Sequence, residues 1–273
     1  MAGDRSGLPP YRREVTATAL WIGGAPGAGK TTVARLLARR HGLRCYSTDT
    51  RTWQHRDRAI AAGNAAAVRW EALSREERWS APPRELLARS LHRERGPMVL
   101  DDVAALPAAP VTVVEGTPVT PTVAGEPALW LLPTPEVQAE RLARRDLPEG
   151  VRTLYRVLAE EIAREVAEAG GRVVVVDGRR GVDATIAEVE QAFDPALRDG
   201  PRATSDAERR ALLRDANAAI VDQHRAYAAR PWAPPGALEV VQAFACECGR
   251  AGCVAEVDLP VAVASAPVRA PGH

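Results

Sequence analysis

Apolar residues recur along the first two thirds of the chain in short, nearly continuous runs rich in valine, leucine and other strand-forming residues. Glycine, proline or a polar residue follows each run. Runs of this kind are typical of strands that are covered on both faces, as in a parallel sheet. The pattern predicts five strands, at residues 15–22, 43–47, 111–114, 128–132 and 172–176.

The segments between these runs place apolar residues at helical spacing. In residues 31–40, valine and leucine recur on one face, and Gly42 follows as a stop signal. Strands that alternate with helices indicate an α/β fold, here a five-stranded parallel sheet with helices on both faces over residues 15–193. Further helices are predicted within 51–95, at 135–145 and at 151–169.

A segment rich in proline, glycine and charge, at 194–204, separates this domain from the rest of the chain. Beyond it, the pattern predicts one helix at about 205–229, a proline-rich joint at 231–236 and two short strands around a cysteine-bearing turn. We therefore expect a second, small α+β unit at 205–273.

The composition narrows the possible functions. With 46% hydrophobic residues, the 273-residue chain can bury a substantial core. A net charge of +1 and an aromatic content of 4% argue against a broad nucleic-acid surface, which needs clustered cations and stacking rings. No apolar run approaches the roughly 18–20 residues of a membrane-spanning helix, and residues 1–14 do not resemble a secretory signal. A cytoplasmic location is therefore expected.

Lysine is almost absent from the chain. Lys30 is the single lysine among 36 basic residues, and all the others are arginines. In a chain that uses arginine almost everywhere, a lysine is expected at a site where a compact ammonium group works and a planar guanidinium group does not. The alternative is chance survival at the surface, and the neighbours of Lys30 decide between the two.

These neighbours form a phosphate-binding loop motif. Residues 24–31 read GAPGAGKT and satisfy G-x-x-x-x-G-K-[ST] between a predicted strand and a predicted helix. In such a loop, backbone N–H groups hold phosphate oxygens, the lysine bridges the β- and γ-phosphates, and the Thr31 hydroxyl ligates Mg²⁺. ATP is favoured over GTP because the guanine-reading N-K-x-D motif needs a second lysine, which the chain lacks. The predicted nucleotide-binding residues are Gly24, Ala25, Gly27, Ala28, Gly29, Lys30, Thr31 and Thr32.

Residues 15–193 resemble the P-loop kinases of the nucleoside-monophosphate-kinase-like group, especially the small-molecule kinases near gluconate kinase, chloramphenicol phosphotransferase and zeta toxin. The resemblance implies an ATP- and Mg²⁺-dependent enzyme that phosphorylates a hydroxylated small molecule. Residues 205–273 are similar to a cysteine-bearing tail of actinobacterial proteins, which implies no activity. The matching pieces are GAPGAGKTT at 24–32, Asp49, VVEG at 113–116, ALWLLPTPEVQAERLARRD at 128–146 and VVVVDGRR at 173–180.

The resemblance also implies roles for acidic residues that follow the predicted strands. Asp49, after the second strand, would take the proton of the acceptor hydroxyl, and the alternative is a helix cap or an Asx turn. Glu115, after the third strand, would position Mg²⁺ through water. We prefer Glu115 to Asp101 and Asp102, since helical register follows that pair.

Three arginines follow the fourth strand. Arg141, Arg144 and Arg145 are spaced so that one helix face presents all three. In the kinases that the chain resembles, lid arginines close over the γ-phosphate, and we assign this role to Arg141 and Arg145. The alternative is a solvated basic face.

Residues 51–95 take the position of the cap that receives the phosphate acceptor in the kinases that the chain resembles. Trp53 and Arg51 are close in sequence to Asp49 and would line the acceptor pocket. Trp70 and Trp79 are expected in the core, because tryptophans at helical spacing usually pack there. The sequence does not identify the acceptor.

Three of the four cysteines crowd together in the C-terminal unit. Cys246, Cys248 and Cys253 lie within eight residues, in a turn that also contains two glycines. Three thiolates need a fourth ligand to complete a closed tetrahedral zinc site; His273 is the preferred candidate, and His224 is the second. A zinc-knuckle-like unit is therefore predicted, and the alternative is reduced cysteines in a turn.

Two functions from different classes follow from these residues. The first is an ATP-dependent phosphotransferase that acts on a hydroxylated small molecule, of which a sugar nucleotide is one example. The second is a regulatory module, in which ATP binding changes how the cysteine tail engages a protein partner. Neither a membrane nor a nucleic acid is expected as a partner.

Overall fold

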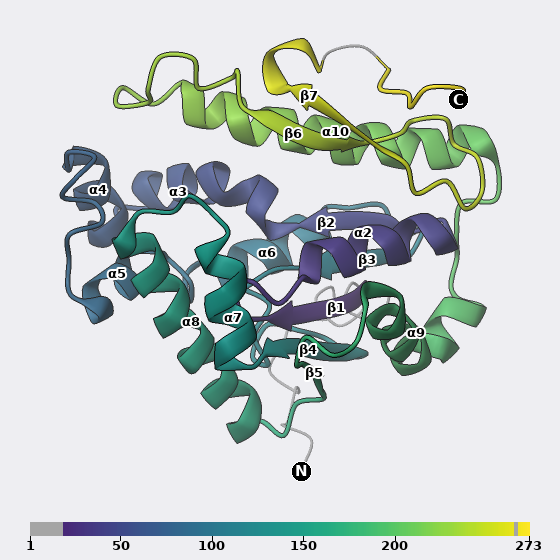
Figure 1. Ribbon diagram of the computed structural model, residues 1–273, viewed down its shortest axis with the longest axis horizontal. Coiled ribbons are helices and arrows are strands. Elements are labelled where there is room, and N and C mark those ends of the chain that lie inside the picture. The colour runs from purple at the N-terminus through teal and green to yellow at the C-terminus, as the bar shows by residue number, and fades with distance from the viewer. Residues whose placement is uncertain (1–18, 265–266) are drawn as a thin grey trace.

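The computed structural model describes residues 19–264 and 267–273. Its centre is a five-stranded, fully parallel sheet in the order β2-β3-β1-β4-β5 (Figure 1). The predicted sheet is confirmed, and residues 15–18 of the first predicted strand lie outside the described part of the chain. The strands are β1 (Ala19–Gly24), β2 (Arg44–Ser47), β3 (Thr112–Glu115), β4 (Ala128–Pro133) and β5 (Val173–Val176).

Helices cover both faces of this sheet, as predicted. Ile22 of β1 packs in the core under α2 (Lys30–His41) and α9 (Val182–Asp199). Its neighbour Trp21 points to the other face and packs in the core under α6 (Arg95–Ala104) and α8 (Glu149–Glu168). Both side chains are fully buried. Burial on both faces explains why β1 reads as a continuous apolar run. The expectation is wrong for β5, an edge strand of the sheet, where Val173 and Val175 are exposed.

The strand register brings three carboxyl ends together at one edge of the sheet. Glu115, the last residue of β3, is in register with Ile22 of β1 and with Ser47 of β2. Because the strands are parallel, the segments that follow them leave from this same edge. The phosphate-loop motif follows β1, and the 3₁₀ helix η1 (Thr48–Arg51), which carries Asp49, follows β2.

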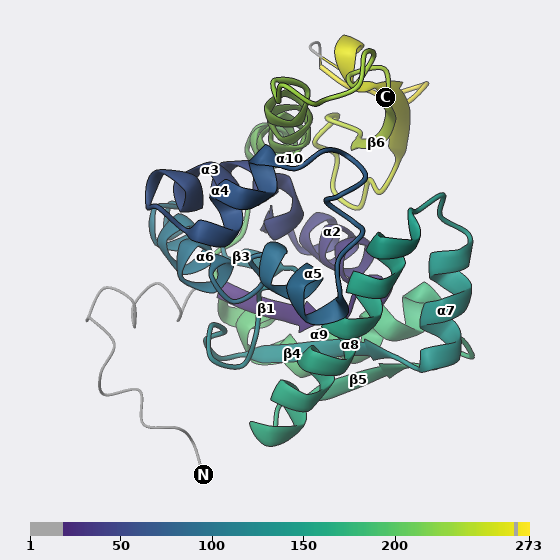
Figure 2. The same ribbon diagram turned by 90° about the vertical axis from the view of Figure 1, so that its left-hand side faces the viewer.

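The region between β2 and β3 folds as a helical cap, which consists of α3 (Thr52–Ala61), α4 (Ala65–Ala72), α5 (Pro83–Arg89) and α6. α5 packs against α8. After β4, α7 (Pro135–Ala143) begins at Thr134, whose side chain accepts a hydrogen bond from the Val137 amide. Figure 2 shows α3 and α4 on one side of the sheet and α7 on the other.

The predicted break at 194–204 is wrong in its first part. α9 continues through Pro195, and the connecting segment begins only at Gly200. A proline inside a helix removes one backbone hydrogen bond. Phe193 and Leu197, on either side of this proline, nevertheless continue the buried apolar stripe of α9 against the sheet. This burial outweighs the lost hydrogen bond.

The C-terminal unit combines a long helix with a hairpin: α10 (Asp206–Ala228), β6 (Val241–Ala245), β7 (Glu256–Pro260) and the 3₁₀ helix η2 (Val261–Val263). A capping box of Ser205 and Glu208 starts α10. Ile220, Phe244 and Val261 pack in its small core. α10 contacts α3, η1 and β2 of the larger domain, and the hairpin lies beside α10, where Glu256 pairs with Arg39 of α2 (Figure 2). Nowhere in the described residues does a helix have the length and apolar character to cross a membrane.

Candidate active site

The loop between β1 and α2 is shaped by two glycines. Gly24 has a φ of 129°, and a Cβ atom there would lie 2.1 Å from the Leu131 carbonyl oxygen. Gly29 has a φ of 90° and precedes α2 in the left-handed conformation. Both positions therefore require glycine. Residues of this loop line a cavity together with the N-terminus of α2, whose positive end favours anions.

Lys30 is the first residue of α2 and is 7% exposed. Its Nζ donates a hydrogen bond to the Ala25 carbonyl oxygen at 2.9 Å. Burial lowers the pKa of Lys30, whereas the charges of Glu115 and Asp49 act in the opposite direction. The single lysine of the chain is thus a buried group in the wall of the cavity and not a chance survivor at the surface.

Glu115 joins the ends of two strands to the phosphate loop. Its Oε1 accepts hydrogen bonds from the Thr31 hydroxyl, at 3.1 Å, and from the Ser47 hydroxyl. The carboxylate is fully buried, and its Oε2 has no hydrogen-bond partner among the described residues. Burial, assisted by the charge of Asp49, raises the pKa of Glu115. A buried carboxylate oxygen without a partner, next to hydroxyl oxygens, suits a hard cation such as Mg²⁺.

Asp49 lies in η1 and lines the same cavity as Lys30. The position of η1 is held from α6 by Arg95, a buried residue whose Nη2 donates a hydrogen bond to the Thr48 carbonyl oxygen. The Nε of Arg95 also donates to Nδ1 of His55, at 3.3 Å. Burial lowers the pKa of Arg95, and the charge of Asp49 opposes this shift. The buried guanidinium of Arg95 therefore links η1, which carries Asp49, to α6 of the cap.

The alternative acidic pair, Asp101 and Asp102, lies in α6. Asp102 accepts a hydrogen bond from the Tyr46 hydroxyl at 2.6 Å and contacts Nε2 of His55 at 2.8 Å and Nη1 of Arg58 at 2.7 Å. These contacts connect α6 to β2 and α3. Neither carboxylate is among the described residues that line the cavity.

The three arginines after β4 do not share one helix face, contrary to the prediction. α7 ends at Ala143, so Arg144 and Arg145 lie beyond it. Arg141 Nη1 donates a hydrogen bond to the Gly27 carbonyl oxygen at 2.8 Å, and Arg145 lines the cavity. Arg144 is exposed and pairs with Glu140 at 2.5 Å. Arg141 therefore braces the phosphate loop, while Arg145 faces the space beside it.

The phosphate loop, Lys30, Asp49 and Arg145 line one cavity of about 500 Å³. The phosphate loop, Asp49 and Arg145 line one part of it, and the helical cap and α8 line the other. Trp53, Trp70 and Trp79 lie in the wall of the cap part. Arg51, which was predicted to line the pocket together with Trp53, is not among the described residues that line the cavity. Trp70 is buried, as predicted for a core residue, but it also borders the cavity.

Several cavity residues are absent from the sequence prediction. They come from α3, from the segment between α4 and α5, from α5 and the turn that follows it, and from the start of α6. No arginine stands out in a chain whose basic residues are almost all arginine, so the sequence carries no signal for them. The unpredicted basic residues of the wall are Arg56, Arg78, Arg89, His92 and Arg95.

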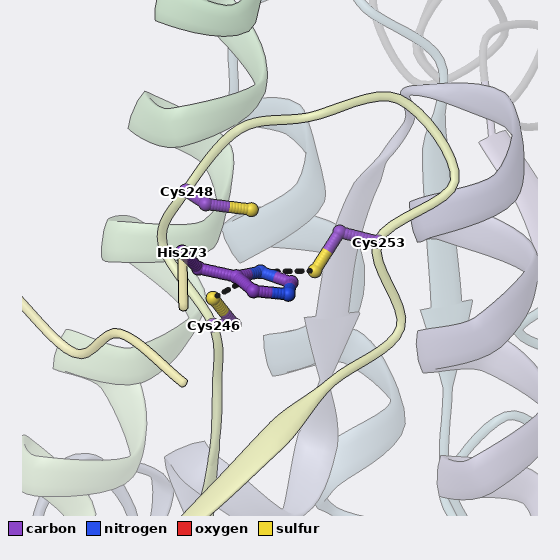
Figure 3. Close-up of side chains that lie close together, drawn as sticks. All are labelled: Cys246, Cys248, Cys253 and His273. Carbon is purple, nitrogen blue, oxygen red and sulfur yellow. Dashed lines mark hydrogen bonds between the residues drawn. The ribbon is translucent and has the colours of Figure 1, made fainter. Parts of the chain in front are cut away.

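The predicted zinc ligands come together in the C-terminal unit. The ligand atoms of Cys246, Cys248, Cys253 and His273 all lie within 4.8 Å of one another, and Figure 3 shows these side chains gathered around one point. Nδ1 of His273 is 3.4 Å from Sγ of Cys246 and 3.5 Å from Sγ of Cys253. The second candidate, His224, lies in α10 and lines a different cavity.

No protein-family model matches the chain, and no curated protein matches it. Among solved structures, the chain is similar to a sugar kinase from Janibacter sp. HTCC2649, with 19% sequence identity, a TM-score of 0.36, and coverage of 66% of this chain and 96% of that chain. It is also similar to deoxyadenosine kinase from M. mycoides, with 12% identity, a TM-score of 0.42, and coverage of 65% of this chain and 99% of that chain. At TM-scores this low, neither likeness bears on what the protein binds or does.

Proposed function

We propose that the protein is an ATP-dependent phosphotransferase that acts on a hydroxyl group of a small molecule. One observation carries the proposal: the phosphate loop, Lys30 and Asp49 line a single cavity whose remaining wall comes mainly from the cap and α8. A cavity of about 500 Å³ is large enough for a nucleotide's phosphates and a small acceptor together. A carboxylate next to a phosphate-binding lysine is suited to accept the proton of an attacking hydroxyl.

In the proposed reaction, the loop amides and the positive end of α2 hold the β- and γ-phosphates, and Lys30 neutralises part of their charge. The acceptor oxygen forms a bond to the γ-phosphorus while the bond between that phosphorus and the β–γ bridging oxygen breaks. Asp49 takes the hydroxyl proton, and ADP leaves with the electron pair of the broken bond. Arg145 adds positive charge beside the transferred group.

Thr31 and Glu115 fit a magnesium ion. Next to the phosphate loop, Thr31 provides a hydroxyl oxygen, and Glu115 provides a buried carboxylate oxygen that has no hydrogen-bond partner in the described chain. When bound, Mg²⁺ would neutralise charge on the β- and γ-phosphates. Ser47 holds the Glu115 carboxylate in place through its hydrogen bond. We therefore propose that the activity depends on magnesium.

We also propose a structural zinc ion in the C-terminal unit. Zn–S bonds of about 2.3 Å and a Zn–N bond of about 2.0–2.1 Å, at a tetrahedral angle, place sulfur and nitrogen about 3.6 Å apart. The two distances from Nδ1 of His273 to sulfur, 3.4 and 3.5 Å, agree with this value. The Ala270 amide donates a hydrogen bond to Sγ of Cys246 at 3.3 Å, which favours a thiolate. Free thiols of this kind persist in the reducing cytosol, where we propose that the protein acts.

The test compares Lys30→Ala and Asp49→Asn with the parent protein. Each is incubated with γ-labelled ATP and a metabolite extract, and ATP binding is measured separately by calorimetry. We expect Lys30→Ala to lose ATP binding, and Asp49→Asn to keep ATP affinity within about threefold while transfer falls by roughly 10²–10⁴. ATP binding without any transfer by the parent would favour the regulatory module instead. Equal ATP affinity of Lys30→Ala and the parent would contradict nucleotide binding at this loop.

A further inference from the structure

Cationic side chains crowd the part of the cavity that the cap forms. Arg56, Arg78, Arg89 and Arg95 all contribute to its wall, in addition to Lys30 and Arg145 beside the phosphate loop. Asp49 is the one carboxylate among the described residues that line the cavity. The wall therefore carries a clear excess of positive charge, although the whole chain has a net charge of only +1.

Arg56, Arg78 and Arg95 of this wall are buried and Arg89 is half-buried, and several nitrogens of these arginines have no protein partner in the described chain. Arg56 is 5% exposed and Arg78 is 2% exposed. Within the described chain, Nε and Nη1 of Arg56, Nη1 of Arg78 and Nε of Arg89 lack a hydrogen-bond acceptor. Leaving a buried polar group unsatisfied costs about 1–3 kcal/mol, and more for a charged group. Donors left open in this way, in the wall of a cavity, favour a ligand that supplies acceptor atoms.

Tryptophans fix the planes of two of these guanidinium groups. The Cζ atom of Arg56 lies 4.1 Å from the ring centroid of Trp70. Arg78 lies between two rings, with its Cζ atom 4.6 Å from the centroid of Trp70 and 3.7 Å from that of Trp232. Stacking on aromatic faces orients guanidinium groups without using their N–H donors. The open donors are therefore held in place before any ligand arrives.

Arg89 pairs with Glu85 at 2.6 Å, whereas no carboxylate of the described residues forms an ion pair with Arg56 or Arg78. Glu71 is the acidic group that favours the charged forms of both Arg56 and Arg78. Its two oxygens are occupied by Arg230 Nη1, at 2.7 Å, and by Trp232 Nε1, at 2.6 Å. Burial lowers the pKa of Arg56 to about 10, so Arg56 is still protonated at neutral pH.

We propose that the phosphate acceptor carries an oxyanionic group, a phosphate or a carboxylate, which binds to the open donors of Arg56 and Arg78 in the cap. This inference rests on the proposed phosphotransfer function and adds the chemical class of the acceptor. The oxyanion anchors the molecule at the far end of the cavity, so that a separate hydroxyl group can reach Asp49. Charge-assisted hydrogen bonds from arginine suit both anions, since both present paired oxygens.

The first experiment identifies the acceptor class with the unaltered protein. A metabolite extract is separated on an anion-exchange column, and each fraction is incubated with the protein and γ-labelled ATP. We expect label to enter a compound of the retained fraction and none of the unretained one. Treating the extract with alkaline phosphatase beforehand distinguishes the two anions, because it destroys a phosphate-bearing acceptor and spares a carboxylate. Transfer only to an uncharged compound of the unretained fraction would overturn the proposal.

A second experiment tests the oxyanion site without any turnover. The phosphate loop is first saturated with magnesium and a non-hydrolysable ATP analogue, and inorganic phosphate or acetate is then titrated while tryptophan fluorescence is recorded. We expect saturable binding that Arg56→Gln weakens by roughly tenfold to a hundredfold, as for a hydrogen bond to a charged group. The matched control, Arg69→Gln, changes an exposed arginine of α4 and should bind like the parent. Equal binding by Arg56→Gln, or no binding of either anion by the parent, would overturn the proposal.

The two experiments separate this inference from the function on which it rests. If no fraction accepts phosphate, the phosphotransfer proposal fails, and the titration then decides the oxyanion site alone. If Arg56→Gln does not fold, judged by its thermal unfolding, the fractionation still decides the acceptor class.

Discussion

The Thr31 hydroxyl donates a hydrogen bond to Oε1 of Glu115 over 3.1 Å, although 84 positions separate the two residues in the chain. Thr31 follows the phosphate loop at the start of α2, and Glu115 ends β3. The contact exists because β3 lies next to β1, with Glu115 in register with Ile22. The parallel sheet thus places a carboxylate beside the loop that follows its central strand, where a cation bound to nucleotide phosphates would lie.

This contact predicts how magnesium dependence responds to Glu115→Gln. The substitution keeps the shape of the side chain but removes the negative charge that suits a divalent cation. We expect the magnesium concentration at half-maximal phosphotransfer to rise by about tenfold or more, equivalent to about 1.4 kcal/mol. Activity is measured over a magnesium titration at saturating ATP. Glu140→Gln, which alters an exposed carboxylate of α7, serves as the control, and a curve unchanged in Glu115→Gln would contradict the assignment.

Removing the hydrogen bond between Arg141 and Gly27 should loosen the phosphate loop. In Arg141→Met, the Gly27 carbonyl oxygen loses a charged donor at 2.8 Å, a contact worth about 1.5–3 kcal/mol. We expect the Kd for ATP to rise by roughly tenfold to a hundredfold. Calorimetric titration with ATP measures this change. The control is Arg144→Met, because Arg144 pairs with Glu140, and similar affinities for the two variants would show that Arg141 does not support the loop.

The C-terminal histidine should be required for tight zinc binding. We expect about one zinc ion per chain in the parent protein and a lower melting temperature after chelation, because the metal contributes folding free energy to a unit with a small core. His273→Ala should lose zinc at chelator concentrations that the parent withstands. His224→Ala, a change in α10 away from the cysteines, should keep it. Elemental analysis and thermal unfolding measure both effects, and a parent protein without zinc would rule out the site.

Because His92 is held in its neutral form, the protein should be less stable in mild acid than at neutral pH. Burial, with the charge of Arg95, lowers the pKa of His92 from 6.5 to about 4. As the pH falls through this window, the unfolded state gains the proton before the folded state does, so the contribution of neutral His92 to stability is lost between about 6.5 and about 4. The pKa difference corresponds to about 3 kcal/mol.

The measurement for His92 is the free energy of unfolding by denaturant at pH 7.5 and pH 4.5, compared between the parent and His92→Phe. Other groups titrate equally in both proteins, so the difference between the two pH dependences isolates His92. The parent should lose about 2–3 kcal/mol more than the variant over this range. Parallel losses would show that His92 is not held in the neutral form.

The main features of the fold follow from local patterns in the sequence. A continuous apolar run such as 19–22 indicates a strand, because a strand that is buried on both faces needs no polar side. The motif at 24–31 predicts the loop between β1 and α2, since its glycines permit backbone angles that other residues avoid. The end of α9 could not be predicted in this way. Pro195 is a local signal for a break, and burial of Phe193 and Leu197 against distant residues overrides it.

The sequence by itself thus determined the order of strands and helices along the chain, the phosphate loop around Lys30, and the acidic residues Asp49 after β2 and Glu115 at the end of β3. Each of these depends on neighbouring positions, where the chain's own geometry dictates the outcome. Only the tertiary structure decided which arginines enter the cavity wall. Arg56 and Arg78 look like any other arginine in the sequence, and it is their packing against Trp70 and Trp232 that distinguishes them. Contacts of that kind depend on how separate helices meet, and the spacing of residues along the chain does not encode them.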